Sequence, residues 1–412
     1  MSLYGTDPAG NPLDRFGLSR PVWLLGWVSF FTDMASEMIY PLLPLFLTRV
    51  LGAGAMSIGV IEGVAEGANS ILKIISGRIA DRTGQPKKLV LMGYGLSSLV
   101  RPLMGFATAW PHVLALRFTD RLGKGVRTSP RDALLARFAP EKTRGRVYGF
   151  HRAMDHAGAV AGPLIATVFL YFHPESYRSL FMWTLVPGLI VMALILRVPD
   201  ERLATRLGDT TVAGGKDAAA VPPGALPRRF YLAMAIIFVF ALGNASDAFI
   251  LLRLNDLGVA PFWIPLLWSA LHVVKMSSSV AGGALSDRFG RRAMIVIGYL
   301  WYAVIYAAFA LSDSLGWGIG IFLAYGLYFG LTEGVEKAWV ADMAPAGARG
   351  TAFGIYNAAL GFGGLAASLI FGAIWTRVSP QAAFLTGAGL ALAASLLLYL
   401  AFSNAQNSRH ER

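Results

Sequence analysis

The residues of this sequence that could do chemistry are acids and bases set inside long apolar stretches. Asp33 and Glu37 lie one helical turn apart in the first stretch, and Glu66 lies in the second. A charged side chain in the middle of a bilayer is costly, so it normally faces a cavity or a partner. A buried carboxylate without a partner takes up a proton more readily, and histidine titrates near neutrality. Groups of this kind can carry protons.

Two sets of candidate residues follow from this pattern. The candidates for proton coupling are Asp33, Glu37, Glu66, Asp155, Asp247 and Glu333. The candidates for lining a substrate cavity are Arg117, Asp120, Arg121, Lys124, His151, Arg152, Asn244, Lys275, Glu336, Tyr356 and Asn357. The cations could pair with the acids or bind an anionic group of a substrate. The alternative is a static network of salt bridges between helices.

The elements that must position these residues are predicted to be membrane-spanning helices. The chain has 412 residues, of which 55% are hydrophobic and 15% are charged. Soluble domains are about 25% charged, so a typical soluble enzyme is excluded. A spanning helix needs about 20 apolar residues, and about twelve segments meet that requirement. Their predicted ranges are 21–46, 56–79, 89–110, 112–135, 148–172, 179–196, 230–252, 261–285, 293–311, 317–340, 353–375 and 382–402.

The basic residues between these spans predict the topology. One set of loops holds nearly all of them, including Arg82, Lys87, Lys88, Arg131 and Arg144. Basic loops face the cytoplasm, so we expect both termini there and the chain in the cell membrane. The net charge of +12 then reflects topology, and no nucleic-acid partner is expected. Residues 198–229 are polar and rich in Gly and Pro, which predicts a linker between halves 1–197 and 230–412.

The two predicted halves repeat one short motif. The stretch with Gly77, Asp81, Arg82 and Gly84 returns with Gly283, Asp287, Arg288 and Gly290. Two similar six-helix halves are typical of secondary transporters whose substrate site lies between them near the midplane. The two aspartates lie at helix ends, where they could form charge-assisted contacts with a neighbouring helix. Such contacts would latch one face of the protein in one state and break in the other.

On these residues the chain resembles the major facilitator superfamily, over roughly residues 20–402. The doubled motif is similar to the superfamily's loops between helices 2 and 3 and between helices 8 and 9. The resemblance implies an all-α fold of two pseudo-symmetric six-helix bundles that rock about a central site. Gly158, Gly162 and Pro163 resemble part of the helix-5 motif of drug and metabolite antiporters, although the trailing glycines are replaced by Ile165 and Ala166. Plain helix packing is the other explanation for this motif.

The charge distribution also separates two kinds of helix. The third predicted span carries only Arg101, and the sixth, ninth and twelfth spans carry no charge. These four helices are therefore predicted to face lipid, and the others to line the interior.

The function expected from the sequence is secondary active transport of a small polar, zwitterionic or anionic organic solute. Proton-driven efflux is the first hypothesis for the mode of transport. The alternative is import, by proton symport or uniport, of a nutrient or of a metal or organic-anion species. A membrane-embedded enzyme is the rival class, but neither an HExxH pair nor a Walker-type glycine loop occurs in the sequence. We expect no cofactor and no bound metal, a proton gradient as the energy source, and a functional monomer in the lipid bilayer.

Overall fold

The computed structural model describes residues 6–14, 16–53, 55–199, 226–260 and 263–402. Within these ranges the chain is almost entirely helical, and its β pairing is limited to two isolated bridges, Thr6 to Pro12 and Leu13 to Ser19. Most of the predicted linker, residues 200–225, lies outside the described residues.

The first half of the chain forms one bundle, which we call the N-half. Its elements are α1 (Arg20–Glu37), η1 (Tyr40–Leu42), α2 (Leu43–Leu45), η2 (Phe46–Val50), α3 (Ala55–Thr83), α4 (Pro86–Leu103), η3 (Met104–Phe106), α5 (Trp110–Arg137), η4 (Glu141–Thr143), α6 (Arg144–Phe172), α7 (Tyr177–Trp183) and α8 (Leu185–Leu196). The second half forms another bundle, the C-half. Its elements are α10 (Arg228–Gly243), α11 (Ala248–Asp256), α12 (Ile264–Phe289), α13 (Arg291–Leu311), α14 (Leu315–Met343), η6 (Ala346–Ala348), α15 (Arg349–Arg377) and α16 (Pro380–Ala401).

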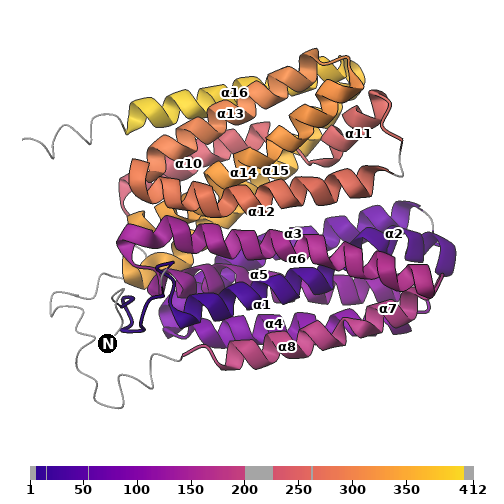
Figure 1. Ribbon diagram of the computed structural model, residues 1–412, viewed down its shortest axis with the longest axis horizontal. Helices are drawn as coiled ribbons and strands as arrows, with labels where there is room; N and C mark the ends of the chain where they lie inside the picture. Colours follow the sequence, from indigo (N-terminus) through magenta and orange to yellow (C-terminus); the bar gives the residue numbers. More distant parts are fainter. Residues whose placement is uncertain (1–5, 15, 54, 200–225, 261–262, 403–412) are drawn as a thin grey trace, which may run out of the picture.

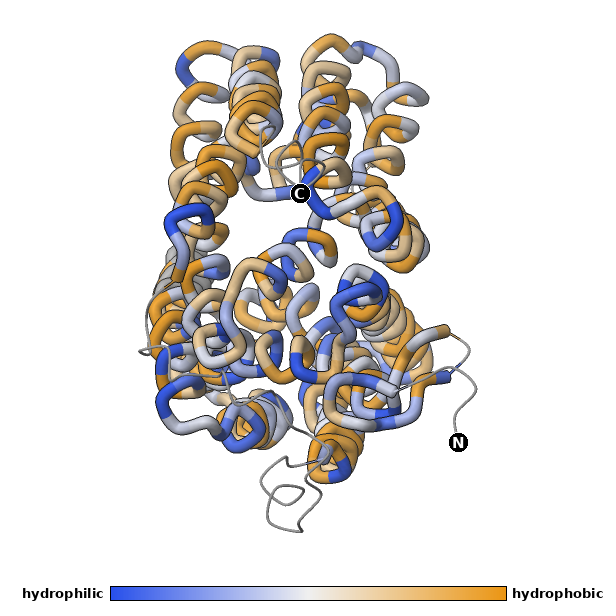
Figure 2. The backbone as a smooth tube through the Cα atoms, turned by 90° about the vertical axis from the view of Figure 1, so that its left-hand side faces the viewer, coloured by the Kyte–Doolittle hydropathy of each residue, from blue (hydrophilic) through white to orange (hydrophobic). Residues whose placement is uncertain are grey.

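The helices of both halves run along the long axis of the molecule (Figure 1). The start of α1 and the end of α16 lie at the same end, where α3 and α12 also finish; we call this the latch end. Seen from it, hydrophilic and hydrophobic segments alternate in both halves (Figure 2).

Apolar length explains why most of these segments become helices. Eight described segments are long and apolar enough to cross a membrane: 86–106, 141–172, 177–196, 228–256, 291–311, 315–343, 346–377 and 380–401. Helix α5 does not meet that composition because charged residues recur along it, from Arg117 to Arg137. It is nevertheless a continuous helix of 28 residues. Ion pairs and hydrogen bonds with other helices must therefore stabilise the charged side chains of α5 inside the membrane.

The four helices predicted to face lipid do lie at the outside of the bundles. Helices α4, α8, α13 and α16 carry large exposed apolar side chains, such as Leu99 (66%), Leu189 (60%), Val304 (59%) and Leu396 (56%). Arg101 of α4 points the other way, because it is buried against Asp120 of α5.

The seventh predicted span is broken, which corrects the continuous helix expected over 230–252. Helix α10 ends at Gly243 and α11 begins at Ala248. The Tyr302 hydroxyl donates to the Gly243 carbonyl at 3.0 Å, and the Ser246 N–H donates to the Ser368 hydroxyl at 3.1 Å. Side chains thus satisfy backbone groups that a continuous helix would have paired, which is what allows a break at membrane depth.

Candidate functional site: the charged interface between the halves

The two repeated aspartates bind helix ends in the opposite half. The Asp81 carboxylate accepts the N–H groups of Gly350 and Thr351, in the first turn of α15, at 2.8 and 2.6 Å. The Asp287 carboxylate accepts those of Gly145 and Arg146, in the first turn of α6, both at 2.9 Å. A helix begins with unpaired N–H groups and partial positive charge, so an anion is stabilising there. The two contacts repeat each other across the halves and form a pair of latches.

The glycines of the motif have two separate uses. A Cβ on Gly77 would lie 2.1 Å from the Gly350 carbonyl oxygen, and one on Gly283 would lie 2.2 Å from that of Gly145. These glycines therefore let the halves touch backbone to backbone. Gly84 and Gly290 end α3 and α12 with φ of +62° and +92°, values that favour glycine.

The arginines of the motif do not join the latch contacts, because Arg82 and Arg288 are exposed. The ion pairs at this end come from other residues. Arg144 binds Asp342 at 2.7 Å, and Arg291 binds Asp287 at 2.5 Å and Asp342 at 3.2 Å. Arg144 to Asp342 spans the interface, so the latch end is closed by charge as well as by glycine contact.

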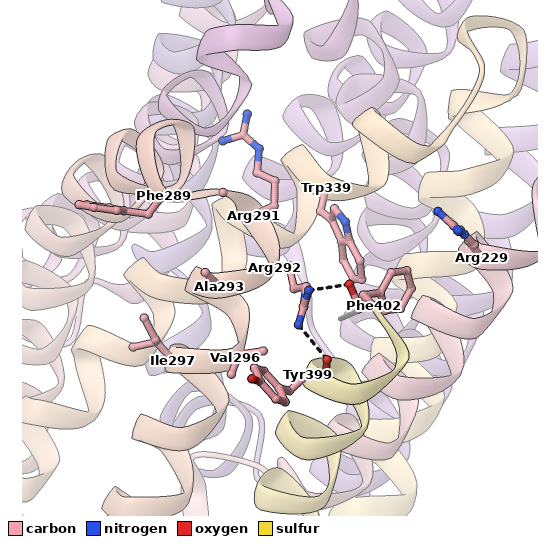
Figure 3. A pocket seen from close by; sticks show the side chains of 11 residues that line it. Arg229, Phe289, Arg291, Arg292, Ala293, Val296, Ile297, Trp339, Tyr399 and Phe402 are labelled. Carbon is pink, nitrogen blue, oxygen red and sulfur yellow. Dashed lines mark hydrogen bonds between the residues drawn. The ribbon is translucent and has the colours of Figure 1, made fainter. Parts of the chain in front are cut away.

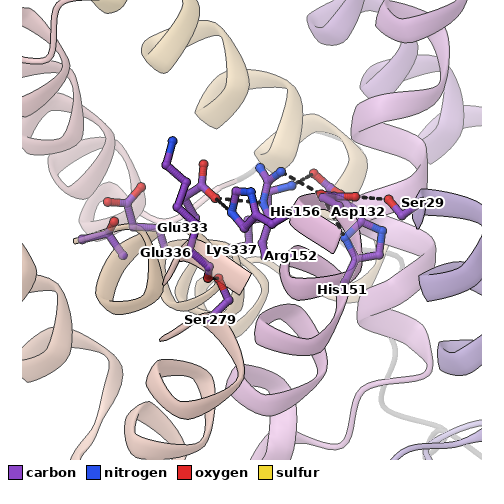
Figure 4. Close-up of polar contacts among 12 residues, drawn as sticks. Ser29, Asp132, His151, Arg152, His156, Ser279, Glu333, Glu336 and Lys337 are labelled. Atoms are coloured by element: carbon purple, nitrogen blue, oxygen red, sulfur yellow. Dashed lines mark hydrogen bonds and ion pairs between the residues drawn. The ribbon is translucent and has the colours of Figure 1, made fainter. Parts of the chain in front are cut away.

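Deeper in the interface, Asp132 of α5 binds Lys337 of α14 at 2.7 Å (Figure 4). Both side chains are buried, and Arg131 binds the second Asp132 oxygen at 3.0 Å. This pair is not among the candidates from the sequence: Arg131 is counted there with the basic loops, although the predicted span 112–135 includes it, and it lies inside α5. The available signal was Lys337 inside an apolar span, which requires a buried anion.

Next to this pair, Glu333 of α14 meets an arginine and a histidine of the N-half. The Arg152 Nε lies 3.7 Å and the His156 Nε2 lies 3.3 Å from its carboxylate (Figure 4). The ring of His156 lies 5.3 Å from that of His272 on α12, centroid to centroid. The predicted candidates Arg152 and Glu333 are thus brought together, along with two histidines outside the candidate sets.

The first predicted cluster, on α1, lies beside this network. Asp155 accepts the Ser29 hydroxyl and binds Arg152 at 2.8 Å, and His151 lies 3.7 Å from it. Asp33 interacts electrostatically with Asp155 and Lys124. Glu37 ends α1 and interacts with Lys124 and with Arg121. The side chain of Glu66 lies outside the described residues.

Other candidates on α5 belong to a tightly paired cluster. Asp120 binds Arg101 at 3.0 Å and accepts the Tyr40 hydroxyl. The Arg117 guanidinium lies 3.5 Å from the centre of the Tyr40 ring and that of Arg121 lies 5.2 Å from it. Asp120 and Arg101 are fully paired and buried, which fits a structural role.

The C-half candidates form two groups of their own. At the break before α11, Asp247 accepts the Tyr325 hydroxyl at 2.7 Å, Lys275 lies 3.4 Å from its carboxylate, and Asn244 contacts Tyr302 and Tyr328. Glu336 accepts the hydroxyls of Tyr299 and Tyr356, both at 2.9 Å. Asn357 donates to the Phe353 carbonyl at 2.7 Å. Glu336, Tyr356 and Asn357 are therefore bonded within their own half.

The helix-5 motif packs α6 against α1. A Cβ on Gly158 would lie 2.3 Å from the Phe30 carbonyl oxygen, and one on Gly162 would lie 2.6 Å from that of Met34. Pro163 lies inside α6 without ending it. Both glycines thus allow α6 to pack closely against α1.

Within the described residues, no group of three or more His, Asp or Glu side chains is arranged to hold a metal ion. The arrangement is instead two helical membrane bundles held together by hydrogen bonds and ion pairs that separation of the bundles would break. That defines a class of protein, the two-bundle membrane transporters.

The chain belongs to the Major Facilitator Superfamily, whose sequence model matches residues 22–335 and 232–412. It is 34% identical over 394 residues to an uncharacterized MFS-type transporter of Methanocaldococcus jannaschii, covering 94% of this chain and 96% of that one. It is 25% identical to a probable 4-methylmuconolactone transporter of Cupriavidus pinatubonensis, covering 86% and 82% of the two chains. The fold is similar to that of the human organic anion transporter MFSD10, with a TM-score of 0.69 at 17% identity over 92% of this chain and 99% of that one. This is a multi-pass membrane protein of a transporter family, and that family is not an enzyme class.

Proposed function

We propose that this chain exports a small polar, zwitterionic or anionic organic solute by proton-coupled alternating access. The observation that carries the proposal is the position of Glu333. Its carboxylate belongs to the C-half, and its partners Arg152 and His156 belong to the N-half. Any rocking of the halves that parts α14 from α6 must change the surroundings of Glu333.

The physical link to protons follows from the cost of burying charge. A Glu333 that loses both partners within a membrane is an unpaired carboxylate, and protonation removes most of that cost. Re-pairing with Arg152 and His156 then favours release of the proton. Asp155 shares Arg152, so the N-half keeps a partner for that guanidinium when Glu333 leaves. One proton per conformational cycle is the simplest stoichiometry.

The substrate class rests on basic side chains of the candidate sets in both halves. Arg121, Lys124 and Lys275 lie on α5 and α12, where a carboxylate group of a solute could meet them. The similarity to a 4-methylmuconolactone transporter supports a small organic solute. Export rests on the partial helix-5 resemblance, and symport is the second candidate.

The test is proton flux in proteoliposomes that hold the purified protein and a pH-sensitive dye. The first probe is 4-methylmuconolactone, followed by a panel of small organic acids that raise the melting temperature. An inward proton gradient should drive the probe out against its concentration. Glu333→Gln should abolish this coupled flux and leave probe exchange intact, and Glu37→Gln tests the α1 carboxylate in the same way.

The matched control is Glu175→Gln, which removes an exposed carboxylate from the loop between α6 and α7. It should transport like the wild type. Accumulation of the probe on the side of lower pH would establish export, whereas movement with the protons would establish symport. Flux that ignores both pH and membrane potential would rule out proton coupling.

A further inference from the structure

A cavity of about 610 Å³ lies at the latch end of the C-half (Figure 3). Its lining comes from the end of α12, the starts of α10 and α13 and the end of α16, together with Trp339 of α14. Helices α13 and α16 are among those that present apolar side chains outward. The cavity therefore opens at the border between the bilayer and the solution that bathes the latch end.

The charged side chains in the cavity lining are basic. Arg229, Arg291 and Arg292 line it, and no acidic side chain of the described residues does. Arg291 is occupied by Asp287 and Asp342. Arg292 donates to the Phe402 and Tyr399 carbonyls at 2.5 and 2.8 Å, which uses two of its five N–H groups. Arg229 is exposed, so Arg229 and the remaining donors of Arg292 can meet an anion.

Much of the rest of the lining is apolar and exposed. Phe289 is 59% exposed, Ile297 50% and Tyr399 55%. Trp339 is buried and packs edge-on against Phe402, with ring centres 5.3 Å apart. Large apolar side chains with this exposure are stable where they meet lipid chains rather than water. The cavity thus combines a cationic edge with an apolar wall.

We propose that this cavity binds one anionic phospholipid. Its phosphate would lie between Arg229 and Arg292, and an acyl chain would run along α13 past Ile297. Basic pockets between transmembrane helices bind lipid headgroups by this combination of charge and apolar contact. Because Arg292 also caps the end of α16, lipid binding would stabilise the contact between α13 and α16.

The test measures the melting temperature of the purified full-length protein in detergent during titration with phosphatidylglycerol. The zwitterionic lipid phosphatidylcholine and inorganic phosphate are titrated in parallel. Phosphatidylglycerol should stabilise the wild type at concentrations where the other two have no effect. Arg229→Gln should weaken the apparent affinity about fivefold, since each basic residue near an anionic surface contributes about 1 kcal/mol. Ala293→Trp fills the cavity without changing charge and should abolish the effect.

The matched control is Lys88→Gln, which removes one positive charge at the start of α4, the N-half counterpart of α13. This variant should bind the lipid like the wild type. An equal loss of lipid affinity in Lys88→Gln and Arg229→Gln would show that diffuse surface charge attracts the lipid, and it would overturn the proposal. So would stabilisation by phosphate alone, or an unchanged response in Ala293→Trp. A chain ended after Phe402 should still bind the lipid; loss of binding there would assign the lipid to the tail instead.

Discussion

At the scale of single residues, Asp132 is a carboxylate at the interface that binds two cations. One of its oxygens binds Lys337 and the other binds Arg131, and no part of the Asp132 side chain reaches solvent. Buried Lys337 and mostly buried Arg131 thus depend on a single carboxylate. The pair with Lys337 also joins the halves, so it contributes both to stability and to closure of the latch end.

We expect Asp132→Asn to cost about 3–5 kcal/mol of unfolding free energy, because it leaves both cations uncompensated. Lys337→Met should cost less, since Asp132 keeps Arg131. The free energies are measured by detergent-induced unfolding of the purified protein. Lys142→Met, at an exposed position of η4, is the control and should leave the unfolding free energy unchanged. Equal losses from the two buried substitutions would show that Arg131 does not compensate Asp132.

At the scale of elements, the latch depends on helices that approach without side chains between them. Gly77 of α3 touches Gly350 of α15, and Gly283 of α12 touches Gly145 of α6. Neither approach leaves room for a methyl group. The aspartate contacts at the helix ends can form only when these backbones meet.

We expect Gly77→Ala to open the latch end, because the added methyl must displace backbone; overpacking of this kind costs about 1–3 kcal/mol. The chain contains no cysteine, so Ala352→Cys, buried in the first turns of α15, gives a single labelling site. Its reaction with a thiol reagent should accelerate in the Gly77→Ala background. Gly320→Ala, where a Cβ meets open space inside α14, should leave the rate unchanged. An unaltered rate in Gly77→Ala would show that the latch closes without this contact.

At the scale of the whole molecule, the basic residues predict which side of the membrane each end faces. The latch end holds Lys142 and the arginines of the ion pairs, and the opposite end holds the loop with Glu175. The excess of positive charge predicts that the latch end faces the cytoplasm.

We therefore expect a membrane-impermeant thiol reagent added to intact cells to label Glu175→Cys and not Lys142→Cys. Both positions are exposed in the structure, so the difference can come only from topology. Permeabilised cells should show both labelled, which is the control for reactivity. The reverse pattern would invert the orientation and place the lipid site of the C-half in the outer leaflet.

Much of the architecture could be predicted from local sequence. Three features depend only on residues near one another in the chain: the apolar runs, the positions of loops and the repeated Gly-Asp-Arg-Gly motif. Hydropathy shows the first two, and residue identity shows the third. The break between α10 and α11 could not be predicted this way, because its backbone groups are satisfied by Tyr302 and Ser368, distant in sequence. The same holds for Asp132 and Lys337, which are 205 residues apart.

The sequence by itself determined that this is a helical membrane protein of two repeated halves with charges buried along particular helix faces. Composition and periodicity are enough for that, since the bilayer permits few alternatives. Only the tertiary structure decided which charges pair: that Asp120 is held by Arg101 within one half, whereas Glu333 meets Arg152 across the interface. The reason is physical, because a pairing depends on how two bundles dock: the repeated motif names one side of each contact, but its partners, such as Gly350 and Gly145, are distant in the sequence.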